Sequence, residues 1–180
     1  DNIGTYYLNL LQEREYRYSK NNDHKWHCLF LNSLQFHSVK YPWSKECPSK
    51  VSNYILRRLP SDIQRLRRKD TQIPKNFSLY ILNNIGNFHF NCYKVFWFSG
   101  SWTLDIYDSM DHSANDTPFS FPKSYEYEKI LSFFGLLLED FDKEKLKCYK
   151  MKSLLQADKP DCLLFSLFNI EQMSWDTTGK

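Results

Sequence analysis

Apolar and polar residues alternate with a helical spacing in the first part of the chain. Between Ile3 and Tyr18 aromatic and aliphatic residues recur every three or four positions, with charged residues between them, which predicts an amphipathic helix. Ser19 to His24 is polar and predicts a loop. Trp26 to Phe36 is apolar enough to predict a second helix or a buried segment. Its expected core residues are Leu29, Phe30, Leu34 and Phe36.

A proline-containing and then basic region follows. The prolines between Lys40 and Pro48 indicate an irregular connection, and Val51 to Leu59 predicts a short helix. Ser61 and Gln64 have the spacing of a capping box, which opens a helix within the basic segment Arg57–Lys69. Such a charge run is usually a solvated face, and the alternative is a docking surface for an acidic partner or nucleic acid.

From Phe77 onward the period changes to that of strands. Phe77 to Leu82, His89 to Phe98 and Trp102 to Tyr107 are rich in aromatic and branched residues and predict three strands. The Ser99-Gly100-Ser101 turn predicts that the last two form a hairpin. Antiparallel pairing of these two strands would bring His89, where the first of them begins, close to the residues that follow Tyr107.

The last part of the chain alternates helix and strand. Ser124 to Leu138 gathers its apolar residues on one side and predicts a helix, and Lys145 to Met151 predicts a fourth strand. Cys162 to Met173 predicts a mostly apolar, buried helix. The order of helices, strands, helix, strand and helix is that of an α+β fold.

Composition narrows the class of protein. A chain of 180 residues with 17% aromatic residues and few glycines is typical of one packed domain. The net charge of +3 does not favour a nucleic-acid partner, and the five scattered cysteines indicate a reducing, intracellular compartment such as cytoplasm or nucleus. No apolar run predicts a membrane span and no signal-peptide pattern stands at the start. His24, His27 and Cys28 lack a second pair at zinc-site spacing, so no metal is expected. No cofactor is expected either, and a monomer is favoured.

Cys162 ends a polar turn and begins the last predicted helix. A helix N-terminus presents unpaired N–H groups and a partial positive charge, which favour a thiolate. The alternative is that Cys162 is a small buried hydrophobe, as most free cysteines are.

Three upstream or neighbouring residues complete a possible catalytic set. The predicted hairpin brings His89, a candidate base, near Asp108, a candidate orienting acceptor. Gln156 lies six residues before Cys162, from where its amide is able to reach an oxyanion. Each has an ordinary alternative: a strand histidine, a turn aspartate and a surface glutamine.

The order of these motifs resembles that of a known family. His89-Phe90, the segment Trp102 to Ser109, and Gln156 followed at a six-residue interval by Cys162 are similar to the clan CE cysteine proteases, the ubiquitin-like-protein (SUMO) proteases, in a divergent form. Further similarity lies in the segments Asp1 to Leu11, Leu31 to Phe36 and Leu79 to Asn84. Of the family's Trp-Leu-Asn-Asp motif only the final Asp would remain, at Asp1.

The resemblance implies one cysteine protease domain over residues 1–180, with a papain-like or adenain-like fold whose mostly antiparallel sheet is flanked by helices. It implies cleavage after the C-terminal Gly-Gly of ubiquitin or SUMO. His89 would deprotonate Cys162, Asp108 would orient His89, and Gln156 with the Cys162 N–H would stabilise the oxyanion. Residues implied in substrate contact are Phe90, Trp102, Leu163, Arg65 and Arg68, with core packing as the alternative for Trp102.

Two departures keep other functions open. Phe90 stands where the family usually has Trp, and Leu163 where it has Gly after the cysteine. The alternatives are an acetyltransferase of the same clan, whose members usually carry Glu in the place of Asp108, and a catalytically weak module that binds a modifier.

Overall fold

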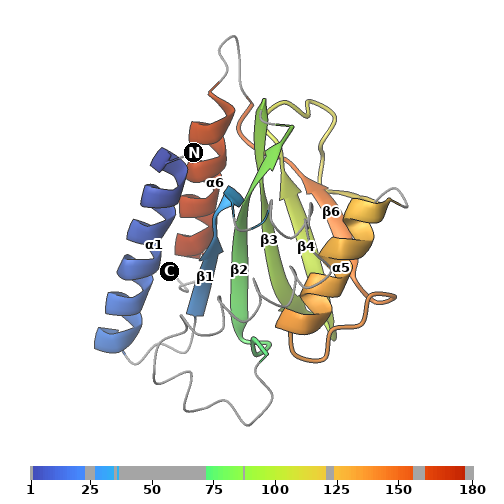
Figure 1. Cartoon of the computed structure of the whole chain (residues 1–180), viewed down its shortest axis with the longest axis horizontal. Coiled ribbons are helices and arrows are strands. Elements are labelled where there is room, and N and C mark those ends of the chain that lie inside the picture. Colours follow the sequence, from blue (N-terminus) through green and yellow to red (C-terminus); the bar gives the residue numbers. More distant parts are fainter. Residues whose placement is uncertain are drawn as a thin grey trace.

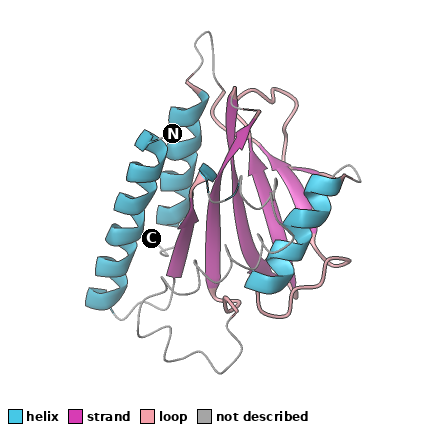
Figure 2. Cartoon of the chain, viewed as in Figure 1, coloured by secondary structure: helices cyan, strands magenta, loops and turns pink. Residues whose placement is uncertain are grey.

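The computed structural model describes residues 2–22, 27–34, 36, 72–86, 88–120, 124–155 and 161–176. The predictions for residues 40–69, including the basic segment, lie outside the described residues. Three helices are described: α1 (Asn2–Asn22), α5 (Tyr125–Leu137) and α6 (Cys162–Asp176). They pack on a mixed sheet in an α+β arrangement, which confirms the predicted fold class (Figures 1 and 2).

The sheet described has six strands in the order β1-β2-β3-β4-β6-β5. Three of its five pairings are antiparallel, as expected, while β1–β2 and β4–β6 are parallel. The strands are β1 (His27–Leu31), β2 (Phe77–Ile85), β3 (His89–Phe98), β4 (Ser101–Tyr107), β5 (Thr117–Pro118) and β6 (Lys147–Met151).

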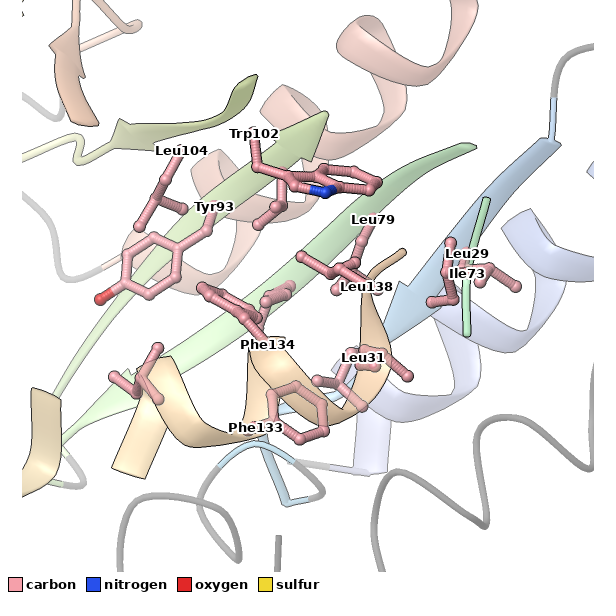
Figure 3. Close-up of a cluster of buried hydrophobic side chains, with 14 of the residues drawn as sticks. Leu29, Leu31, Ile73, Leu79, Tyr93, Trp102, Leu104, Phe133, Phe134 and Leu138 are labelled. Carbon is pink, nitrogen blue, oxygen red and sulfur yellow. The ribbon is translucent and has the colours of Figure 1, made fainter. Parts of the chain in front are cut away.

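Each face of the sheet carries its own hydrophobic core. Helix α5 covers one face, where Trp102, Phe133 and Phe134 are almost fully buried (Figure 3). Helices α1 and α6 cover the other face, over Tyr80 and Cys92 (Figure 1). Alternate strand residues point to opposite faces, so β2 and β3 contribute to both cores.

A two-residue turn joins β3 to β4. Ser99 and Gly100 have φ angles of 49° and 83°, and Phe98 pairs with Ser101. Positive φ at both central positions is the geometry that matches the right-handed twist of a hairpin. The turn fixes the register in which Cys92 opposes Tyr107, so the predicted hairpin is confirmed.

The N-terminal part differs from prediction in two places, α1 and Leu34, and decides between two alternatives in a third. Helix α1 continues to Asn22 through most of the predicted loop. Within Trp26–Phe36 the chain forms strand β1, so the buried-segment alternative is confirmed there and not the helix, because this short apolar run pairs in parallel with β2. Leu34, an expected core residue, is 57% exposed, whereas Phe36 is fully buried.

Helix α1 also protects the edge of the sheet. The Gln12 side chain donates to the Cys28 carbonyl at 3.1 Å and accepts from the Phe30 amide at 3.1 Å. One side-chain amide therefore takes the place that a neighbouring strand would have beside β1. Edge strands left unpaired invite pairing with other chains, and Gln12 blocks that on β1.

Candidate active site

The residues singled out in the sequence lie at one end of the sheet, where β2 and β4 end and β3 begins. Ile85 at the end of β2 pairs with His89, which begins β3, and Tyr107 at the end of β4 pairs with both Cys92 and Met151. Helix α6 begins at this end as well, because the Phe90 amide contacts the Cys162 sulfur. The hairpin register and the helix start thus bring separate segments to one place.

His89 and Asp108 are in direct contact. The His89 Nε2 lies 2.7 Å from the Asp108 Oδ1, and the two side chains are 17% and 22% exposed. A carboxylate accepts and does not donate, so this contact places the proton of a neutral imidazole on Nε2. The Nδ1 then carries the lone pair and is the ring nitrogen able to accept a proton.

That second nitrogen is held out of solvent without a partner. The His89 Nδ1 is buried and has no hydrogen bond among the described residues. Buried polar atoms are nearly always paired, and an unpaired one in a folded protein calls for an explanation. A nitrogen kept to accept a proton during a reaction would be one such explanation.

Cys162 is the first residue of α6 and is 6% exposed. The Phe90 N–H donates to its sulfur at 3.4 Å, and this amide nitrogen is bonded directly to the carbonyl carbon of His89. The Asp161 carbonyl accepts the Phe165 N–H at 3.1 Å as the first hydrogen bond of the helix. The sulfur therefore lies at a helix N-terminus and contacts the backbone amide of the residue that follows His89.

The backbone around Asp108 is tied at several points that the sequence did not reveal. Its Oδ1 also accepts the Met110 N–H at 2.9 Å, and its carbonyl accepts the Ser153 hydroxyl at 3.0 Å. Ser153 follows β6, so its position depends on the parallel pairing of β4 with β6. A side chain placed by such a distant pairing leaves no local signal in the sequence.

The remaining predicted site residues fall into three groups. Phe90 and Leu163 are partly buried and pack together with the core under α1 and α6. Trp102 is 2% exposed and donates to the Glu139 carbonyl at 2.8 Å, at the end of β4 remote from Asp108. The core alternative therefore holds for Trp102. Gln156, Arg65 and Arg68 lie outside the described residues.

Other cysteines differ from Cys162 in their surroundings. The four described cysteines are all free thiols. Burial raises the pKa of Cys148 to about 12 and that of Cys92 further, with the charges of Asp105 and Asp108 adding to the respective shifts. These two thiols stay protonated at neutral pH and serve the core.

The described ranges hold no group of three or more His, Cys, Asp or Glu side chains placed to bind a metal ion. None of the helices in those ranges combines the length and the apolar character needed to cross a bilayer.

Comparison with known proteins places the fold. No family model matches the chain, and no curated protein matches it in sequence. Among solved structures, a de-sumoylating protease is 14% identical with a TM-score of 0.58, over 98% of this chain and 63% of that protein. The effector XopD of Xanthomonas campestris, solved bound to ubiquitin, is 18% identical with a TM-score of 0.57, over 96% of this chain and 74% of that one.

The SUMO protease Ulp1, solved with its catalytic cysteine oxidised to a sulfinic acid, is 14% identical with a TM-score of 0.54, over 98% of this chain and 66% of that one. The chain thus spans less than two thirds of the first of these proteases and about two thirds of Ulp1. At these identities the similarity establishes the fold, which is the one that the sequence resemblance predicted.

Proposed function

We propose that the protein is a cysteine protease that cleaves after the C-terminal Gly-Gly of a ubiquitin-like modifier. The observation that carries the proposal is the arrangement around His89: Asp108 contacts its Nε2, its Nδ1 is buried with no hydrogen bond among the described residues, and the N–H of the next residue, Phe90, donates to the Cys162 sulfur at 3.4 Å. Base, orienting acid and thiol are the parts that nucleophilic acyl transfer requires.

The reaction follows from these positions. The Cys162 proton passes to the His89 Nδ1 as the sulfur attacks the carbonyl carbon of the terminal glycine, and Asp108 stabilises the imidazolium. The Cys162 N–H and Gln156 are the proposed donors to the oxyanion. Collapse of the tetrahedral intermediate breaks the C–N bond, and His89 gives its proton to the leaving amine. Water then attacks the thioester with His89 as base, the C–S bond breaks, the proton returns from His89 to the Cys162 sulfur, and the modifier leaves with a free carboxylate.

A protein substrate is supported by the surface around the site. Exposed apolar side chains follow or precede the catalytic positions: Phe88 is 91% exposed, Met110 57% and Leu164 59%. Isolated exposed apolar residues are ordinary, but three that flank the proposed catalytic residues in sequence are available for contact with a protein substrate. XopD and Ulp1, which share this fold, act as ubiquitin-like protein and SUMO proteases, which supports ubiquitin or SUMO as the modifier.

The two alternative functions gain no support from the described residues. A binding module was favoured by Leu163, but the packing of Leu163 against the core beneath α6 accounts for an apolar residue there. An acetyltransferase was disfavoured already by Asp108, where that branch of the clan usually has Glu.

Electrophilic probes test the proposal. Ubiquitin and SUMO carrying a C-terminal electrophile are incubated separately with the wild type, Cys162→Ala and Cys148→Ala. We expect a covalent adduct with one modifier or both, lost in Cys162→Ala and retained in Cys148→Ala, because Cys148 is a core thiol. Absence of any adduct on the wild type rejects the protease function, and acetyl-CoA-dependent self-acetylation would replace it with the transferase.

A further inference from the structure

We propose that Lys150 is a positioning residue for this reaction. Its ion pair with Asp111 holds the turn formed by residues 108–111, and the turn holds the Asp108 carboxylate against His89. The inference rests on the proposed protease function, and it concerns residues to which neither the sequence motifs nor the shared fold gives a role.

The direction of the Asp108 side chain depends on the shape of this turn. The Asp108 Oδ1 accepts the Met110 N–H at 2.9 Å in addition to the His89 Nε2 at 2.7 Å. The Asp108 carbonyl accepts the Asp111 N–H at 3.2 Å, which closes the turn. A shift of Asp111 therefore moves the Met110 amide and reorients the oxygen that holds His89.

Asp111 is in turn anchored by its own carboxylate. Its Oδ2 accepts Lys150 Nζ at 2.7 Å, and its Oδ1 accepts the Ser113 N–H at 3.0 Å and the Ser113 hydroxyl. These contacts, the one with Lys150 first, lower the pKa of Asp111 to about 2. The carboxylate therefore keeps its charge throughout the pH range in which a cysteine protease is assayed.

Lys150, the other partner of the ion pair, is also held in place. It lies within β6 opposite Ile106 of β4, so its backbone belongs to the same sheet that ends at Asp108. Its ammonium also lies 5.3 Å from the centre of the Phe119 ring. The Asp111 side chain is only 19% exposed and that of Lys150 36%, so the pair is partly shielded from solvent.

The turn and the ion pair border a cavity. A cavity of about 180 Å³ borders Asp108, Asp111 and Lys150, and Asn91, Tyr93 and Phe119 complete much of its wall. Side chains beside an open cavity have fewer fixed neighbours, so the ion pair is a main tie between the turn and β6. A partly exposed ion pair contributes little to stability, whereas a displacement of a catalytic group by a fraction of an ångström lowers the rate.

The chain offers a closely matched control. Lys75 pairs with Asp140 at 2.6 Å, lies 4.5 Å from the centre of the Trp97 ring and has the same 36% side-chain exposure. It precedes β2 at the end of the sheet remote from His89. Lys150→Met and Lys75→Met each remove one positive charge and one contact with an aromatic ring, and Lys75 lies far from the turn. Its partner Asp140 is more exposed than Asp111, 68% against 19%.

The first test uses a ubiquitin or SUMO conjugate with a fluorogenic leaving group. We expect Lys150→Met to lower kcat about 10-fold with KM changed less than about twofold, and Lys150→Arg to restore most of kcat, because only the orientation of Asp108 has changed. Lys75→Met is expected to keep both constants within about twofold of the wild type. An unchanged kcat in Lys150→Met overturns the proposal.

A double substitution separates positioning from a general loss of structure. In an Asp108→Ala background, Lys150→Met is expected to lower kcat by less than about twofold, because the carboxylate that Lys150 positions is gone. The same 10-fold loss in both backgrounds overturns the proposal.

A third readout needs no substrate. The proton on His89 Nε2, hydrogen-bonded to a carboxylate, gives a downfield ¹H NMR signal that we expect to weaken in Lys150→Met and persist in Lys75→Met. An intact signal in Lys150→Met overturns the positioning role. A wild type that shows the signal but cleaves no conjugate rejects the protease function, and with it any catalytic effect of Lys150.

Discussion

Replacing Asp108 by Asn tests the account at the contact that defines the site. The amide keeps the size of the side chain and an oxygen able to accept from Met110, but it removes the charge 2.7 Å from His89 Nε2. At the effective dielectric constant of a partly exposed site, two charges about 4 Å apart attract by about 4 kcal/mol. An imidazolium formed during acyl transfer loses most of that attraction in Asp108→Asn.

A loss of about 3 to 4 kcal/mol in the transition state corresponds to a decrease of about 10²- to 10³-fold in kcat. KM is expected to change little, because Asp108 touches His89 and not the substrate. The assay is the initial rate on a modifier with a fluorogenic C-terminal amide, with thermal unfolding measured on the same samples. A decrease smaller than about fivefold, in a variant that melts like the wild type, would refute the role of Asp108.

Three further predictions concern stability. Gln12→Ala removes both hydrogen bonds to β1 and is expected to lower the free energy of unfolding by about 2 kcal/mol, or Tm by about 4 to 8 °C. Arg17→Ala, which breaks an exposed ion pair on the same helix, is the control and should lower it by less than about 1 kcal/mol. Gly100→Val is expected to cost about 1 to 2 kcal/mol in chemical denaturation through backbone strain, because φ is 83° while no heavy atom lies within 4 Å of the added Cβ; a neutral result would contradict the turn geometry. Burial raises the pKa of Asp105 from 3.8 to about 6, so the stability that its protonated form contributes is present below about pH 4 and is lost as the pH rises to about 6. Asp105→Asn should remove this loss of roughly 3 kcal/mol, and a pH profile of Tm that the substitution leaves unchanged would refute the prediction.

Local signals in the sequence predicted the elements that carry the site. The bounds expected for β3 agree with the structure, and the Ser99-Gly100 turn correctly indicated its antiparallel partner. Because hairpin pairing follows from residues close in sequence, the approach of His89 to Asp108 was also predictable. Likewise α5 lies within the helix predicted from Ser124 to Leu138, and the Ser124 hydroxyl caps it by accepting the Tyr127 N–H.

Features that depend on distant pairings were missed. Strand β1 is a short apolar run whose parallel partner β2 comes much later in the chain, so its periodicity alone did not distinguish strand from helix. Lys150 and Ser153 reach the Asp108 turn through the parallel pairing of β4 with β6, which crosses over by way of α5. Trp102 had a place in the motif but lies in the core, because its position at the start of β4 puts it at the remote end of the sheet.

The most direct measurement is the rate and position of covalent modification by a modifier carrying a C-terminal electrophile. We expect mass spectrometry to locate the adduct on Cys162, and His89→Ala to slow its formation at neutral pH by at least about 100-fold while the fold is retained. An adduct on another cysteine, or a rate on Cys162 that is independent of His89, would contradict the assignment of these two residues as nucleophile and base.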